Sequence, residues 1–143
     1  MTITQISIFL ENRKGRLYEV CDILGKNKIN IRALTIAETQ DFGILRIVVD
    51  KPQQALKALK KQGFVVHLSD IVAIEVDDSP GGLAGILKVL SQDGINLEYM
   101  YGFVEKFSKN ALLVLRFDQP DKAVALLKKN KIRVIGKEEI VNL

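Results

Sequence analysis

The stretch that decides the fold reads ENRKGRLYEVCDILGKNKINI at residues 11–31, and it returns in altered form as DDSPGGLAGILKVLSQDGINL at residues 77–97. Each stretch has a glycine ahead of an apolar helical pattern and an Ile-Asn pair behind it. An offset of 66 residues brings five identical residue types into register. The pairs are Gly15 with Gly81, Leu17 with Leu83, Leu24 with Leu90, Ile29 with Ile95, and Asn30 with Asn96.

The similarity continues on the C-terminal side of each stretch. After an insertion of two residues the offset becomes 68, and six further positions coincide. Repetition on this scale predicts two copies of one structural unit. We therefore expect two domains, at residues 1–69 and 70–143. The additional pairs are Asp50 with Asp118, Pro52 with Pro120, Ala55 with Ala123, Leu59 with Leu127, Lys60 with Lys128, and Lys61 with Lys129.

Both copies predict the same order of elements. Runs rich in β-branched residues predict strands over 4–10, 29–37, 43–50 and 64–68, and again over 71–76, 95–104, 111–118 and 132–135. A proline begins the second helix of each copy, where its missing N–H costs little. Apolar residues at helical spacing predict the first helix of each copy: Leu17, Val20, Cys21 and Leu24, and then Leu83, Ile86, Leu87 and Leu90.

The resulting order is βαββαβ, twice. This is the α+β ferredoxin-like unit, an antiparallel sheet with two helices on one face. The last residues, 138–143, resemble the start of another first strand. We expect them to form an extra strand in the second domain, which either adds to a sheet edge or crosses to a partner subunit.

Composition narrows the class of protein. The chain has 143 residues, 48% of them hydrophobic and 27% charged, as in soluble globular proteins. No apolar run approaches the roughly 20 residues that span a bilayer, and the N-terminus lacks the features of a signal peptide. A single cysteine, Cys21, excludes an internal disulfide and suits a reducing cytoplasm. The net charge of +4 is spread over predicted helix faces, so we do not expect a nucleic-acid partner.

The glycine loop before the second copy's helix, DDSPGGL, raises the question of chemistry. It matches neither the Walker nor the Rossmann phosphate loop. Ser79 lacks the GxSxG context of a nucleophile, and the only histidine, His67, lies in the other copy. One His and one Cys do not make a metal site. We therefore expect no catalytic residue, no metal and no cofactor.

The N-terminal end of a helix, here called the helix mouth, can still bind a small anion. The first turn exposes backbone N–H groups and a partial positive charge, which together receive a carboxylate. Glycine leaves room for a ligand to approach the backbone. The repeated loops therefore favour binding of a small carboxylate over catalysis.

These loops resemble those of ACT domains, small amino-acid-sensing modules attached to many metabolic enzymes. The resemblance covers nearly the whole chain, one module per copy. It rests on the pattern N-x-x-G-x-L at residues 12–17, and on DSPGGL with the turn G-I-N at residues 78–83 and 94–96. It implies a regulatory protein without catalysis of its own, whose ligand lies at a seam between modules and changes their arrangement. A homodimer and a separate metabolic enzyme are the partners we expect.

The resemblance also implies which residues bind. The helix-mouth loops would hold the carboxylate, while Asn30 and Asn96 would meet the amino group or only cap a turn. The copies differ, because Asp78 replaces Asn12 and Gly82 replaces Arg16, so whether one or both sites are occupied stays open, as does the identity of the amino acid. The implied residues are Asn12, Arg13, Gly15, Arg16, Leu17, Asn30 and Ile31, with Asp78, Ser79, Gly81, Gly82, Leu83, Asn96 and Leu97.

RNA binding is the alternative interpretation. Tyr99, Tyr101 and Phe103 recur with period two and so share one face of a predicted strand. RRM domains have the same topology and stack bases on sheet aromatics. The stretch YGFV matches the RRM signature only in part, and the first copy has Ala33, Thr35 and Ala37 at the equivalent positions.

Overall fold

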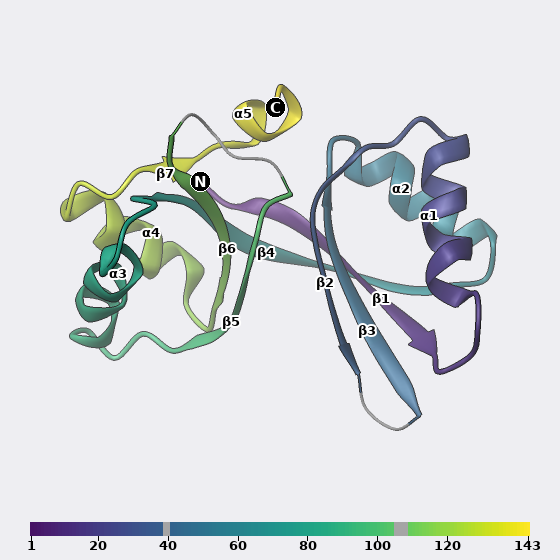
Figure 1. Cartoon of the computed structure of the whole chain (residues 1–143), viewed down its shortest axis with the longest axis horizontal. Coiled ribbons are helices and arrows are strands. Elements are labelled where there is room, and N and C mark those ends of the chain that lie inside the picture. The colour runs from purple at the N-terminus through teal and green to yellow at the C-terminus, as the bar shows by residue number, and fades with distance from the viewer. Residues whose placement is uncertain (39–40, 105–108) are drawn as a thin grey trace. The chain divides into compact units, whose positions relative to one another are not determined.

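The computed structural model describes residues 1–38, 41–104 and 109–143 (Figure 1). Contacts divide the chain into two compact units. The first module comprises Thr4–Ser69, and the second comprises Asp70–Leu143 together with Met1–Ile3.

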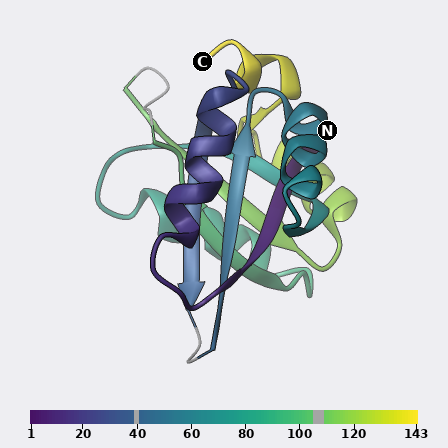
Figure 2. The ribbon, with the colours of Figure 1, turned by 90° about the vertical axis from the view of Figure 1, so that its right-hand side faces the viewer.

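The first module is a four-stranded antiparallel sheet with two helices on one face. Its strands follow the order β2-β3-β1-β4. Figure 2 shows α1 and α2 together in front of this sheet. The elements are β1 (Ile3–Glu11), α1 (Arg16–Lys26), β2 (Ile31–Glu38), β3 (Phe42–Val49), α2 (Pro52–Lys61) and the first part of β4 (Val65–Val76).

The second module repeats this arrangement. Its strand order is β7-β4-β6-β5. In both modules the first strand therefore lies between the fourth and the third, and the second strand lies at the edge beside the third. The predicted α+β class with two ferredoxin-like units is confirmed. The elements are the second part of β4, α3 (Gly82–Ser91), β5 (Leu97–Gly102), β6 (Ala111–Phe117), α4 (Pro120–Lys129), β7 (Val134–Ile135) and α5 (Lys137–Val141).

Each module has its own hydrophobic core between sheet and helices. Alternate residues of β1, such as Ile6 and Ile8, meet the apolar stripe of α1 in the first core. In the second core, Phe117 at the end of β6 is completely buried. The equivalent leucines Leu59 and Leu127 are also completely buried, one in each core.

A repeated clamp closes the end of the sheet opposite the helix mouths. The Asp50 carboxylate accepts a hydrogen bond from the backbone N–H of Asn30 at 2.9 Å, and the Asp50 N–H returns one to the Asn30 carbonyl at 3.1 Å. Asp118 and Asn96 make the same pair of bonds at 3.0 and 3.1 Å. The sequence repeat therefore reflects repeated hydrogen bonding as well as repeated packing.

Two expectations about strands need correction. The runs 64–68 and 71–76 form one continuous strand, β4, because no glycine or proline interrupts them. The C-terminal strand at 138–143 is wrong, since this segment is the helix α5. Glu138 and Glu139 lie in its first turn, where negative charge is favourable, and the Glu139 carboxylate accepts a hydrogen bond from the Gly136 N–H at 3.4 Å.

Among the described residues, no helix is long and apolar enough to cross a membrane.

Candidate functional site

The mouths of α1 and α3 have the same backbone geometry. Their N-cap glycines, Gly15 and Gly81, both adopt the left-handed region with φ of 84°. Any other residue there would be strained. Three backbone hydrogen bonds recur in both loops. In the first loop, the N–H groups of Arg13, Arg16 and Glu19 donate to the carbonyls of Glu11, Arg13 and Gly15, respectively. In the second loop, the N–H groups of Ser79, Gly82 and Gly85 donate to the carbonyls of Asp77, Ser79 and Gly81.

No side chain among the described residues caps either helix. Apart from the N–H groups of Arg16 and Gly82, which bond within their own loops, the N–H groups of the first turn therefore keep their capacity to bind an anion. The helix dipole adds a partial positive charge at the same place. Each mouth has the electrostatics that a carboxylate needs.

A small cavity of about 130 Å³ lies at the mouth of α1. It brings together four of the expected residues, which are Asn12, Arg13, Arg16 and Leu17. Its two carboxylates, Glu11 and Glu38, were not predicted, because they come from the ends of different strands. The remaining lining residues are Leu10, Ile36, Phe42 and Gly43.

The two arginines at this cavity differ in their contacts. Arg16 places its guanidinium over the Phe64 ring, 4.2 Å from the centroid, and bonds Glu19 at 2.7 Å. Its side chain is only 16% exposed, so Arg16, one of the expected ligand-binding residues, packs within the module. The Arg13 side chain is 57% exposed, with looser ion pairs to Glu11 at 3.8 Å and Glu19 at 4.0 Å. Arg13 is therefore the better placed cation for a ligand.

The expected residues at the start of the second strand of each module lie away from the helix mouths. Asn30 and Ile31 follow α1, next to the end of β3 at Val49, whereas the helix-mouth loop begins where Glu11 pairs with Phe42. The seven residue steps from Phe42 to Val49 correspond to about 23 Å at about 3.3 Å per residue. Asn96 and Leu97 are separated from the α3 mouth in the same way. One module cannot bring both groups to one small ligand.

Gly82 has a structural reason of its own. A Cβ at this position would collide with the backbone carbonyl oxygen of Asp77. We expected the glycine to clear space for a ligand, but the loop itself requires it. Of the expected residues of the second copy, Gly82 lines a cavity, while Asp78, Ser79, Gly81 and Leu83 do not line that cavity.

A family model described as an ACT domain pair matches residues 1–143. The chain belongs to the ACT-domain family. Its two modules are therefore two ACT domains, as the helix-mouth motifs suggested. A comparison with curated proteins gives no match.

Solved structures agree on the fold of this ACT domain pair. Protein BT0572 from Bacteroides thetaiotaomicron is 43% identical, with a TM-score of 0.93 and coverage of 100% of this chain and 98% of that one. The regulatory subunit of aspartate kinase from Thermus thermophilus is 17% identical, with a TM-score of 0.64 and coverage of 88% and 91%. The corresponding subunit from Thermus flavus is 18% identical, with a TM-score of 0.60 and coverage of 88% and 90%.

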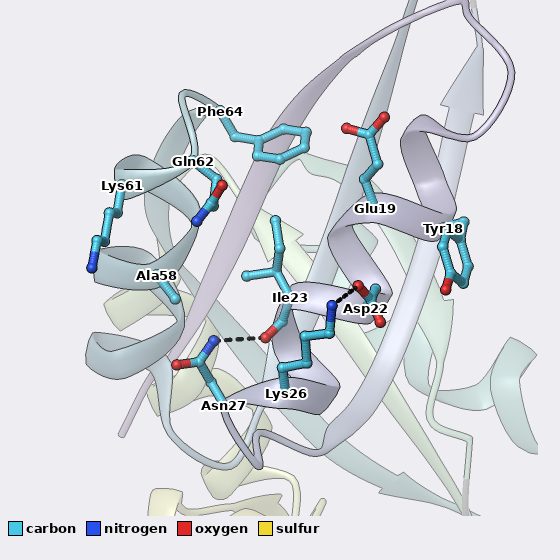
Figure 3. A pocket seen from close by; sticks show the side chains of 10 residues that line it. All are labelled: Tyr18, Glu19, Asp22, Ile23, Lys26, Asn27, Ala58, Lys61, Gln62 and Phe64. Carbon is cyan, nitrogen blue, oxygen red and sulfur yellow. Dashed lines mark hydrogen bonds and ion pairs between the residues drawn. The ribbon is translucent and has the colours of Figure 1, made fainter.

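Another groove of the first ACT domain lies between its helices α1 and α2 (Figure 3). It has a volume of about 390 Å³ and involves none of the expected site residues. Two of its polar side chains bond within the groove: Lys26 pairs with Asp22 at 2.9 Å, and the Asn27 amide donates to the Ile23 backbone carbonyl at 2.8 Å. Hydrogen bonding to Asp22 raises the pKa of Lys26. We interpret this groove as the ordinary surface between two packed helices.

The aromatic face expected for RNA binding is not available. Tyr101 is only 8% exposed, so its ring cannot stack on a base. Tyr99 and Phe103 are half-buried.

The single cysteine, Cys21, is also half-buried, and its burial raises the pKa of the thiol, which disfavours the reactive thiolate.

Proposed function

We propose that this ACT domain pair binds a free amino acid and acts as a regulatory protein without catalysis of its own. The observation that carries the proposal is the cavity at the α1 mouth, which gathers cationic and anionic groups around a helix N-terminus. An amino acid carries one charge of each sign, so it is complementary to such a cavity. Family membership supports the same interpretation.

In this proposal the helix mouth orients the ligand. The first-turn N–H groups and the Arg13 guanidinium receive the α-carboxylate. Glu11 and Glu38 receive the ammonium group. Leu17 and Phe42 provide apolar surface for the ligand's side chain.

A second ACT domain would complete the site. Asn30 and Asn96 lie far from the mouth of their own domain, so they would act on a ligand held by another one. We propose that ligand binding favours one arrangement of domains over others by its differential affinity. A separate metabolic enzyme would respond to that change. The relatives from Thermus are regulatory subunits of aspartate kinase, but at this level of identity they share only the fold with this chain.

We further propose a cytoplasmic homodimer. The face of the first domain's sheet that carries Phe9 and Phe42 leaves both rings substantially exposed. Apolar surface of this kind favours contact with another protein surface. A single cysteine suits a reducing compartment, where free amino acids are abundant.

Thermal unfolding in the presence of each common amino acid tests the proposed function. At a concentration of about 100 times Kd, a ligand that binds only the folded state contributes about 2.7 kcal/mol. We expect one amino acid, or a few related ones, to raise the midpoint by several degrees at millimolar concentration. If none does, the proposed function is wrong.

Replacement of Arg13 by alanine identifies the site. Loss of a charge-assisted hydrogen bond of about 1.5–3 kcal/mol predicts affinity reduced by at least about tenfold. Lys14→Ala is the matched control, because Lys14 is an adjacent exposed cation that does not line the cavity. Equal affinity of both variants would place the ligand away from the α1 mouth.

A further inference from the structure

The open face of the first module's sheet, on the side away from α1 and α2, carries a row of apolar side chains. Phe9 alternates along β1 with the core residues Ile8 and Leu10, so it lies on the opposite face of the sheet. Phe9 and Ala37 both pair with Ile44 of β3, one from each side. The three side chains therefore form a continuous row across three strands.

A hollow of about 370 Å³ lies over this row. Phe42 also lines the hollow, two residues before Ile44 on the same face of β3, and Glu38 adds a carboxylate. Phe9 is 39% exposed and Phe42 is 56% exposed. The volume lies within the roughly 300–1,000 Å³ of binding pockets, and exposed apolar surface of this kind marks a site of interaction.

The second module is polar at the equivalent place. The Glu75 carboxylate accepts one hydrogen bond from the Asn110 amide at 2.9 Å and another from the Arg133 guanidinium at 2.9 Å. Three bonded polar residues thus replace three apolar ones. At the offsets of the repeat, Glu75, Asn110 and Arg133 correspond to Phe9, Phe42 and Val65.

This polar cluster holds the helix α5. Arg133 precedes the core residue Val134, so its side chain lies on the open face of the second sheet. Its guanidinium also bonds Glu139, in the first turn of α5, at 2.6 Å. Ile140, the next residue of α5, is buried. A short amphipathic helix is therefore anchored at the place that corresponds to the hollow.

The first module has a different chain course at this point. Residues 69–73 correspond to α5, and they lie within β4, where the chain passes into the second module. Phe9, Phe42 and Val65 cannot form the ion pair that holds α5, but all three are exposed and apolar. A helix at this place would be held by apolar anchors instead.

The charge of the first module indicates the character of such a helix. Thr4–Ser69 contains 11 Lys and Arg residues against 6 Asp and Glu residues, a net charge of +5 in a chain whose total is +4. Electrostatic attraction therefore favours an acidic partner. The helix α5 is acidic in its first turn as well, through Glu138 and Glu139.

We propose that the hollow of the first module binds an acidic amphipathic helix of a partner protein. The helix lays its apolar face over the hollow, and its aliphatic side chains contact Phe9, Phe42 and Ile44, as in other helix-in-groove complexes. The inference rests on the proposed function for the existence of a separate partner, but not for the amino acid. A homodimer would then use the rest of this face.

A synthetic helical peptide, with leucines along one face and glutamates along the other, tests the hollow directly. Titrated into the full-length protein, it should cause saturable amide chemical shifts at Phe9, Ala37 and Ile44. A peptide of the same composition in scrambled order has no apolar face. It should bind at least about tenfold more weakly, because it cannot present its anchors together.

Two variants test the residues. Phe9→Gln should weaken binding of the peptide by at least about tenfold, since it removes a central aromatic anchor. Tyr18→Gln is the matched control, because Tyr18 is also an exposed aromatic residue but lies on α1, and it should leave Kd within about twofold. Ala37→Glu fills the hollow with a like charge at an exposed position and should also weaken binding. It keeps the test decisive if Phe9→Gln folds poorly.

Three results would overturn the inference: no shifts in the hollow, equal affinity for the scrambled peptide, or equal affinity of the Phe9→Gln and Tyr18→Gln proteins. If the peptide does not bind and Ala37→Glu converts a dimer to monomers in sedimentation, a second copy covers the hollow instead. If an amino acid raises the unfolding midpoint but the peptide does not bind, the proposed function stands and this inference is wrong. If the peptide binds as expected but no amino acid raises the midpoint, the hollow is a docking site and the proposed amino-acid binding is wrong.

Discussion

Replacing Phe117 by alanine is expected to lower the free energy of unfolding of the second module by about 3–5 kcal/mol, the usual loss for a buried aromatic residue. Phe117 ends β6 and is completely buried in the second core. Its neighbours there, such as Leu90 and Leu127, lie on helices that cannot close around the lost ring without moving. Urea denaturation followed by circular dichroism measures the loss, and hydrogen exchange at the amides of β6 assigns it to this module.

Tyr18→Ala is the control for Phe117→Ala. Tyr18 is also aromatic, but it is 71% exposed on α1. Its removal should change stability by no more than about 0.5 kcal/mol. A loss of less than about 1 kcal/mol for Phe117→Ala would show that Phe117 does not support the core as described.

The fold could be predicted because its determinants are local and occur twice. Leu59 and Leu127 recur at a fixed offset with helical spacing around them, and both turn out to be core residues. Gly15 and Gly81 mark the same left-handed cap. Each local sequence pattern occurs a second time at the equivalent position, so patterns that are weak individually were together sufficient to predict the fold.

The C-terminal segment had no second copy to compare. A resemblance to the start of a first strand suggested a strand, yet the segment forms a helix whose first turn is stabilised by Glu139. Arg133, six residues earlier, also bonds Glu139 at 2.6 Å. Spacing along the sequence did not indicate that contact, so the strand prediction failed.

The candidate site could be predicted only in part for a similar reason. The motif placed Asn12, Arg13 and Leu17 at one helix mouth, because all three lie in one loop. It could not show that Arg16 turns toward Phe64, a residue 48 positions away. Cavities depend on such distant contacts, which no local motif records.

Gly82→Ala and Gly85→Ala are expected to change stability in opposite directions, although both put a methyl group on α3. At Gly82 the new Cβ collides with the Asp77 carbonyl oxygen, so the loop must shift, at a cost of about 1–3 kcal/mol, as for other overpacked sites. At Gly85 no atom lies within 4 Å of the added carbon, and alanine's better helix propensity should contribute about 0.5–1 kcal/mol.

Denaturation curves of the two variants and the unchanged protein give the answer directly, since each substitution serves as the control for the other. The comparison also separates two reasons for a glycine at a helix mouth. If Gly82 only made room for a ligand, Gly82→Ala would bind more weakly but unfold at the same urea concentration as the unchanged protein. If the loop needs Gly82 for its own backbone contact, stability falls even without any ligand. The collision with Asp77 favours the second result, and equal stability of Gly82→Ala and the unchanged protein would contradict it.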